Sequence, residues 1–254
     1  MMLNDCIRHT VHYGLISGLL LFSGAVRASG LQVSPISLTL QARQNASGLT
    51  LSNSGNNVVN AQVRVYHWSQ NNMRDELESS RGLLASPPMI RLNPGEQQLI
   101  RIIRTKTQSQ DIAAAEDAFR LLINELPVKS DDKKTGLQFV LSYSLPVFVQ
   151  PKGTKKIGPK LQWSAQTQPN TDQIKLKVSN SGNGHAQLAA LSFVDSNNNL
   201  TEINKGLLGY VLPGSTMHWV LKISPATLKK GGKFKVLMNG TQTIPDITLE
   251  NFTH

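Results

Sequence analysis

The feature of this 254-residue chain that most restricts its fold is a succession of short segments in which apolar and polar residues alternate. Alternation with a period of two indicates β-strands with one buried face, and Asn, Gly, Ser and Pro separate the segments. Only residues 111–119 suggest a short helical turn. Many short strands at this spacing predict β-sandwiches. The segments lie at residues 31–40, 49–52, 61–68, 97–104, 119–126, 137–149, 161–165, 174–178, 187–194, 217–223 and 233–238.

A weak internal repeat favours two domains. The pentapeptide Ser-Asn-Ser-Gly-Asn at residues 52–56 recurs at residues 179–183, each time after a short alternating segment. Pro94-Gly95 recurs as Pro213-Gly214 at a similar displacement. Both are natural turns, because Asn and Gly tolerate positive φ, so turn chemistry alone could repeat by coincidence. The agreement of both displacements with half the chain length favours duplication.

The boundary between the two domains lies in a stretch rich in Lys, Pro and Gly at residues 150–159. We predict an N-terminal domain over residues 29–150, a linker over residues 151–158 and a C-terminal domain over residues 159–254. Two sandwiches joined by a short linker leave a cleft between them, and such junctions are common binding sites.

Residues 1–28 have the pattern of a secretory signal peptide, with an apolar stretch followed by small residues around Ala28. The alternative is an uncleaved anchor helix, although the apolar stretch is short for a membrane span. Cleavage would remove Cys6, the single cysteine, so the mature chain would hold no disulfide and no cysteine-based zinc site. The formal net charge is +10, which in an exported protein indicates surface solvation or capture of an acidic group rather than nucleic-acid binding.

Residues 137–149 form the most informative segment. Leu137, Phe139, Leu141 and Tyr143 share one face of the predicted strand, because side chains alternate. Pro146 removes a backbone donor, which places the strand at an edge or ends its pairing there. An ordinary core strand is an equal alternative from periodicity alone. An exposed apolar edge invites aggregation, whereas completing the unfinished sheet of a partner would give such an edge a purpose.

The N-terminal half resembles the periplasmic pilus-assembly chaperones of the chaperone–usher pathway. The order and spacing of the motifs carry the resemblance, which is weaker in the C-terminal half. The motifs are Val33-Ser34-Pro35, Leu51-Ser52-Asn53, the segment 63–68, the segment 86–95, Ile100-Arg101-Ile102, Phe119-Arg120-Leu121, Glu125-Leu126-Pro127, the segment 143–148, Val178-Ser179-Asn180 and Leu212-Pro213-Gly214.

The resemblance implies an all-β fold of two immunoglobulin-like β-sandwich domains in a boomerang arrangement. It implies a periplasmic chaperone that stabilises incomplete pilin subunits by donor-strand complementation and delivers them to an outer-membrane usher. Leu137, Phe139, Leu141 and Tyr143 fall where the donor side chains of the family lie. It implies no enzyme activity, cofactor, metal, nucleic acid or small-molecule substrate, and it leaves self-association of the free chaperone open.

In this family, basic residues in the cleft bind the C-terminal carboxylate of the subunit. The classical branch uses an Arg on the first strand and a Lys late in the last strand of the N-terminal domain. Ser37 and Pro146 occupy those positions here, so the chain is closer to the archaic or alternative branch. The anchor is therefore expected elsewhere.

Strand direction suggests where the anchor lies. Residues 119–126 should pair antiparallel with the last strand, which brings Arg120 toward the cleft, and Lys152 follows that strand directly. Arg can bind a carboxylate with two hydrogen bonds, and Lys adds a point charge. Arg101 and Arg104 are weaker candidates, and the alternative for both is a solvated strand face.

Other chemistry has little support in the sequence. No histidine lies in a metal-binding spacing, and no nucleophile elbow or phosphate-binding loop is present. The remaining alternative is an exported two-domain adhesin or structural pilus protein. A carbohydrate-binding sandwich would favour clustered aromatic residues, and the three Trp are dispersed in the sequence.

Overall fold

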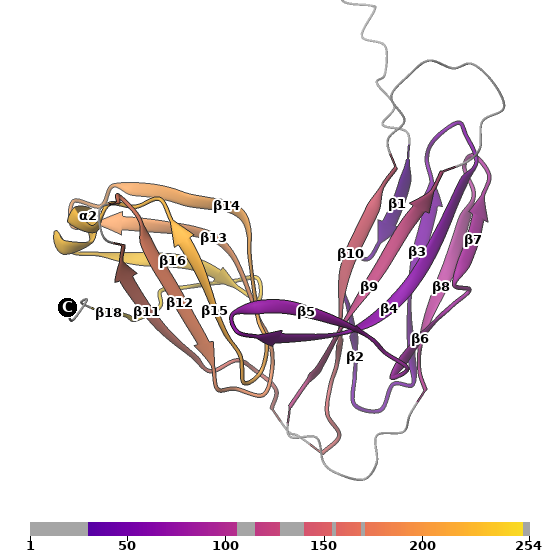
Figure 1. Cartoon of the computed structure of the whole chain (residues 1–254), viewed down its shortest axis with the longest axis horizontal. Helices are drawn as coiled ribbons and strands as arrows, with labels where there is room; N and C mark the ends of the chain where they lie inside the picture. Colours follow the sequence, from indigo (N-terminus) through magenta and orange to yellow (C-terminus); the bar gives the residue numbers. More distant parts are fainter. Residues whose placement is uncertain (1–29, 106–114, 128–139, 154–155, 169–170, 251–254) are drawn as a thin grey trace, which may run out of the picture.

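The computed structural model describes residues 30–105, 115–127, 140–153, 156–168 and 171–250. These residues are mostly strands, with one short helix, α2 (Pro225–Lys229). The strands up to Val149 and those from Leu161 onward form separate sheets, arranged as the two arms of a V (Figure 1). This architecture confirms the predicted all-β fold class. Within the described ranges, no helix is long and apolar enough to span a bilayer.

Two sheets form the N-terminal arm. One has the order β1-β3-β8-β6, and the larger has the order β2-β10-β9-β4-β5, with β7 also paired to β4. β2 and β10 run parallel, whereas β10 and β9 run antiparallel, as predicted for residues 119–126. The strands are β1 (Leu31–Ser34), β2 (Leu38–Leu40), β3 (Ala46–Asn53), β4 (Val59–Asn71), β5 (Arg74–Ser79), β6 (Leu83–Ser86), β7 (Met89–Leu92), β8 (Gln97–Arg104), β9 (Asp117–Leu126) and β10 (Ser142–Val149).

The C-terminal arm has two four-stranded sheets, ordered β15-β12-β11-β18 and β14-β13-β16-β17. The alternation in β12 is complete, with Ile174, Leu176 and Val178 fully buried between lysines and serine. The strands are β11 (Leu161–Thr167), β12 (Ile174–Asn180), β13 (Ala186–Asp195), β14 (Leu200–Val211), β15 (Thr216–Leu221), β16 (Gly232–Met238), β17 (Thr241–Thr243) and β18 (Ile247–Glu250).

Each arm encloses its own apolar core between its two sheets. The N-terminal core contains Leu40, Leu51, Ile100 and Leu121, all fully buried. One prediction was wrong at the start of β9. Residues 117–119 belong to this strand and not to a helical turn, because Phe119 packs in the N-terminal core while its neighbour Ala118 packs in a separate cluster on the other face of the sheet. Residues 111–114 lie outside the described residues.

The first copy of the repeated pentapeptide closes one end of the N-terminal arm around a buried asparagine. The Nδ2 of Asn53 donates to the carbonyls of Asn57 (2.7 Å) and Leu92 (3.1 Å). The backbone N–H of Gly55 donates to Asn53 Oδ1 (3.0 Å). Gly95, from the repeated Pro-Gly pair, donates its N–H to the carbonyl of Asn53 (2.8 Å).

The second copy builds the same corner in the C-terminal arm. The Nδ2 of Asn180 donates to the carbonyls of Gly184 (2.8 Å) and Val211 (3.1 Å). Gly182 N–H donates to Asn180 Oδ1 (2.9 Å), and Gly214 N–H donates to the carbonyl of Asn180 (2.8 Å). The sequence repeat therefore corresponds to a repeated hydrogen-bond pattern.

Candidate functional site

A small apolar cluster joins the two arms at the base of the V. Trp68 from β4, Ala118 from β9 and Phe148 from β10 pack against Tyr210 and Leu212 from the end of β14, and all are at most 7% exposed. The rings of Trp68 and Tyr210 meet edge to face, with centroids 5.4 Å apart at 83°. Such contacts are favourable beyond the area that they bury, so the cluster ties the domains together.

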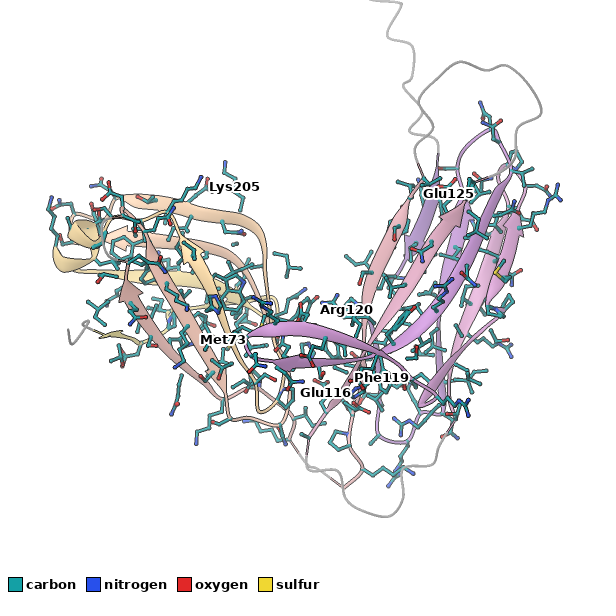
Figure 2. All side chains as sticks on the ribbon, in the orientation of Figure 1. Met73, Glu116, Phe119, Arg120, Glu125 and Lys205 are labelled. Atoms are coloured by element: carbon teal, nitrogen blue, oxygen red, sulfur yellow. The ribbon has the colours of Figure 1, made fainter. Side chains whose placement is uncertain are left out.

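Gln70 bridges the domains beside this cluster. Its Nε2 donates to the carbonyl of Tyr210 (3.0 Å) and to Asp75 Oδ1 (2.9 Å), and its Oε1 accepts from the N–H of Leu212 (2.8 Å). Trp68 Nε1 also donates to Asp75 Oδ1 (2.9 Å). The hairpin of β4 and β5 reaches the C-terminal arm in this way, and Figure 2 shows Met73 at its tip.

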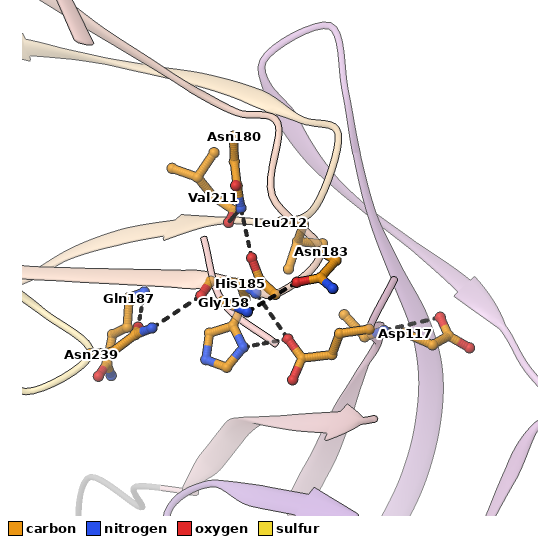
Figure 3. A network of polar contacts seen from close by, with 12 residues as sticks. Asp117, Gly158, Asn180, Asn183, His185, Gln187, Val211, Leu212 and Asn239 are labelled. Carbon is orange, nitrogen blue, oxygen red and sulfur yellow. Dashed lines mark hydrogen bonds and ion pairs between the residues drawn. The ribbon is translucent and has the colours of Figure 1, made fainter. Parts of the chain in front are cut away.

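A second link joins Glu116 to His185, in the polar network of Figure 3. Glu116 Oε2 accepts from the backbone N–H of His185 (2.9 Å) and lies 2.6 Å from its Nδ1, while the side chain of Glu116 is 3% exposed. The N–H of Glu116 donates to the carbonyl of Asn183 (2.9 Å). The His185 ring stacks on Phe148 with centroids 3.5 Å apart. The domains are thus joined by apolar and hydrogen-bonding contacts together.

Arg120 lies at this junction, on the outer face of the larger N-terminal sheet (Figure 2). Its Cζ is 3.7 Å from the centroid of the Trp68 ring and 5.3 Å from that of Tyr210. Burial lowers the pKa of Arg120, and the charge of Asp75 partly opposes this effect. The guanidinium still stays protonated at neutral pH, since its ordinary pKa is very high. Within the described ranges, its side-chain nitrogen atoms form no ion pair or hydrogen bond and are not buried without a partner, so they can serve a ligand.

The edge of β10 leads to Arg120. β9 pairs with β10 along its whole length, but β2 covers the opposite edge only at Val147–Val149. Among the residues that the structure describes, no strand pairs with that edge between Ser142 and Pro146. Pro146 lies opposite Arg120 in the register of the two strands. A chain added to this edge would therefore end beside a partly buried cation.

Comparisons with known proteins agree with this architecture. Residues 30–155 match the family of pili and flagellar-assembly chaperones at the PapD N-terminal domain. The chain is 37% identical over 70 residues to the uncharacterized fimbrial chaperone YqiH of Escherichia coli (strain K12), which is 28% of the length of each protein.

Solved structures of pilus chaperones share the whole fold. A chain of the CsuC–CsuE chaperone–tip adhesion subunit complex, from the archaic chaperone–usher Csu pili of Acinetobacter baumannii, is 25% identical with a TM-score of 0.66, covering 87% of this chain and 99% of that chain. The chain belongs to the chaperone–usher family of pilus-assembly chaperones. The E. coli chaperone DraB, at 18% identity and a TM-score of 0.58 over 87% of this chain and 97% of its own, has the same two-domain fold.

The structure describes part of the predicted donor segment of this chaperone. Leu137 and Phe139 lie outside the described residues. Leu141 is 37% exposed and pairs through its carbonyl with the N–H of Glu125 (2.9 Å). Tyr143 packs partly against the N-terminal core, and its hydroxyl donates to the carbonyl of Leu31 on β1. Of the two described donor residues, Tyr143 therefore lies where β10 meets β1 across the N-terminal core, and Leu141 precedes it along the chain.

The four predicted anchor residues lie in different surroundings. Arg120 alone contacts the junction cluster among the described residues. Lys152 is exposed just beyond β10, and Arg101 is exposed on β8 in the other sheet. Arg104 is half-buried at the end of β8, where its Nη1 donates to the carbonyl of Ala42 (3.4 Å). Burial lowers the pKa of Arg104, and Asp117 partly opposes this effect.

Sequence reasoning missed the residues that surround Arg120. Trp68 and Tyr210 come from different domains, and Gln70 holds both through Asp75 and the Tyr210 carbonyl. The three Trp are dispersed in the sequence, and no pattern couples residues so far apart. In the described part of the chain, no group of His, Cys, Asp or Glu side chains is arranged to hold a metal ion.

Proposed function

We propose that this chaperone resides in the periplasm, stabilises incomplete pilin subunits by donor-strand complementation, and delivers them to an outer-membrane usher. The observation that carries the proposal is the unpaired edge of β10 between Ser142 and Pro146, which ends beside Arg120. Two related structures support a subunit partner, since one is a complex of a chaperone with a tip adhesion subunit and the other a complex of the SafA pilin with the SafB chaperone of Salmonella enterica.

The donor segment supplies enough binding free energy for this role. Leu137, Phe139, Leu141 and Tyr143 would enter the groove of a subunit that lacks a strand, while the edge of β10 supplies backbone hydrogen bonds. Burying an exposed large apolar side chain contributes about 1.5–3 kcal/mol, so roughly 6–12 kcal/mol is the upper bound for four, because Leu141 and Tyr143 are already partly buried in the free chaperone. This amount is comparable to the stability of a whole domain, so it can keep an incomplete subunit folded.

Arg120 would fix the register of the donated strand. A shift by one residue would turn the donor side chains away from the groove. A subunit whose terminal carboxylate binds Arg120 cannot shift, because the carboxylate is the end of its chain. The open nitrogen atoms of the guanidinium suit this pairing, since Arg and carboxylate form two parallel hydrogen bonds.

Replacing donor residues tests the complementation. We expect the Phe139→Ser, Leu141→Ser double variant to lose most co-purified subunit from a periplasmic extract, while its thermal unfolding stays close to that of the parent. The matched control is Leu200→Ser, Leu207→Ser on β14, where both leucines are more than half exposed. Undiminished subunit recovery with the donor variant would refute the assignment.

Replacing Arg120 tests the anchor. Hydrogen bonds to charged groups contribute about 1.5–3 kcal/mol, so Arg120→Ala should weaken subunit binding roughly 10- to 100-fold. Arg91→Ala, which removes an exposed arginine from β7, is the control and should have almost no effect. Equal losses of affinity in the two variants, measured by titration of purified chaperone with a subunit, would eliminate Arg120 as the anchor.

A further inference from the structure

We infer that the carboxylate site is built by both domains, with Tyr210 of the C-terminal domain as a specificity-determining residue and Gln70 as its positioning residue. This inference rests on the proposed function, because it concerns the site assigned to Arg120. The preference of the site for a free C-terminal carboxylate would then depend on how the two domains dock against each other. Arg120 on the N-terminal arm alone would then be an incomplete receptor.

The geometry around the guanidinium carries the first step. Trp68 and Tyr210 present two nearly perpendicular rings, and the Arg120 Cζ lies within cation–π distance of both. Both rings are almost fully buried, at 2% and 7% exposure. A ring face attracts a cation without accepting its hydrogen bonds as a carboxylate would. The rings therefore hold the guanidinium in a partly dry place and leave its N–H donors for an incoming carboxylate.

The attachment of Tyr210 carries the second step. Its hydroxyl accepts from Gln187 Nε2 (2.9 Å) within the C-terminal domain, and its carbonyl accepts from Gln70 Nε2 (3.0 Å) of the N-terminal domain. Gln70 is 8% exposed, and all its amide bonds go to the hairpin or to the other domain. Tyr210 is thus held at its hydroxyl by its own domain and at its backbone by the N-terminal domain, so the position of its ring over Arg120 depends on how the two domains dock.

The carboxylate of Asp75, which lies near the site and could compete for Arg120, already accepts two hydrogen bonds. Asp75 is the carboxylate whose charge acts on Arg120, but its Oδ1 accepts from both Trp68 and Gln70. Asp75 therefore positions the Trp68 ring rather than pairing with the guanidinium. Coupling between sites is reciprocal, so a bound carboxylate should also favour the observed arrangement of the two arms.

Two small probes test the inference on the full chain. N-acetylglycine mimics a free chain end, and N-acetylglycinamide mimics a continuing chain. Their affinities would be measured by NMR titration, following the Trp68 indole N–H and the Arg120 Nε–H. We expect the parent protein to prefer the acid, Tyr210→Leu to reduce this acid-to-amide ratio by about five-fold, and Tyr210→Phe to keep it within about two-fold, because Phe retains the ring face.

A control variant and a second substitution at position 210 distinguish the effect of the aromatic ring face from the effect of a loosened domain junction. Phe148→Leu removes an aromatic ring from the same cluster, but this ring is stacked on His185 rather than on Arg120. It should leave the ratio unchanged. Pentafluorophenylalanine at position 210 keeps the shape of Phe but reverses the charge distribution of the ring, so the ratio should fall as it does in Tyr210→Leu.

The outcomes distinguish this inference from the proposed function. A parent protein without preference for the acid, or an unchanged preference in Arg120→Ala, would remove the anchor itself. A preference that Arg120→Ala abolishes and that both Tyr210→Leu and the fluorinated residue preserve would overturn the two-domain site alone. An equal fall in Phe148→Leu would also overturn it, because the effect would then come from a loosened junction.

Discussion

The two domains contain the same asparagine corner in different surroundings. In the N-terminal domain the corner of Asn53 lies at the end where the chain enters β1, and Ser54 donates its N–H and hydroxyl to the carbonyl of Gly30. In the C-terminal domain Ser181 makes the equivalent bonds to Lys160, which belongs to the chain entering from the linker. Among the residues that the structure describes, only the second corner contacts the other domain, through the carbonyl of Asn183 and the N–H of Glu116. The first copy of the motif thus closes the free end of the N-terminal domain, and the second copy contributes to the contact between the domains.

The free edges of the two domains differ in a way that matters for function. β14, an edge strand of the C-terminal domain, carries Lys205, Gly206 and Gly209 and has bulges in its pairing with β13. Charges, glycines and bulges are the usual means of blocking unwanted strand addition. Both edges expose apolar side chains, Val140 and Leu141 before β10 and Leu200 and Leu207 on β14, so the difference lies in the lysine and the bulges of β14. The contrast supports the proposal that the β10 edge is kept available for a partner.

The largest expected effect separates the two corners. Asn180→Ala removes four side-chain hydrogen bonds, including that from Lys160 N–H to Oδ1 (3.0 Å), whereas Asn53→Ala removes three. At about 1 kcal/mol for each buried bond, the costs should be about 4 and 3 kcal/mol. Urea unfolding, followed separately for each domain by NMR, would measure them. Equal costs, or a larger one at Asn53, would show that the additional hydrogen bond of Asn180 to Lys160 does not stabilise the C-terminal corner.

Much of the fold follows from the sequence because the signals are local. The alternation of Ile174, Leu176 and Val178 predicts a strand without reference to the rest of the chain, and the repeated Asn and Gly residues mark equivalent turns. β5 was not predicted, since its residues are all exposed and it forms only by pairing with β4. The bulged β14 was missed for a similar reason, because Gly206 and Gly209 interrupt its pattern.

The candidate site was predictable only in part. Arg120 could be placed near the junction because strand direction and antiparallel pairing fix which end of β9 lies there. The aromatic surroundings could not be predicted, since Trp68 and Tyr210 meet only when the two domains dock. Gln70 gives no sequence signal either, because a glutamine that is buried and bridges two domains cannot be distinguished in the sequence from one that is exposed to solvent. The role of the donor residues stays a prediction.

An intermediate effect is expected from the hydrogen-bonded link between Glu116 and His185 at the junction. Glu116→Ala leaves the His185 N–H and Nδ1 without their acceptor in a partly buried place, which should cost about 2–3 kcal/mol. Because this link joins the domains, the loss should appear as reduced coupling: urea unfolding should change from one transition toward two. Glu116→Gln, which keeps an acceptor, is the matched control and should lie between the parent and Glu116→Ala. A single unchanged transition in Glu116→Ala would show that the apolar cluster alone couples the domains.

The smallest effect is expected from an ion pair outside the junction. Lys205 and Glu202 lie 3.1 Å apart, but their side chains are 82% and 57% exposed, against 21% and 3% for His185 and Glu116. Exposed pairs contribute about 0–1 kcal/mol, because water screens the charges and the side chains lose freedom. Lys205→Ala should therefore change the free energy of unfolding by about 0.5 kcal/mol or less, and that small change should vanish at high salt. A cost similar to that of Glu116→Ala would mean that burial does not explain the difference between the two pairs. It would also indicate that Lys205 stabilises the β14 edge through more than its charge, since exposed charge alone cannot account for so large a loss.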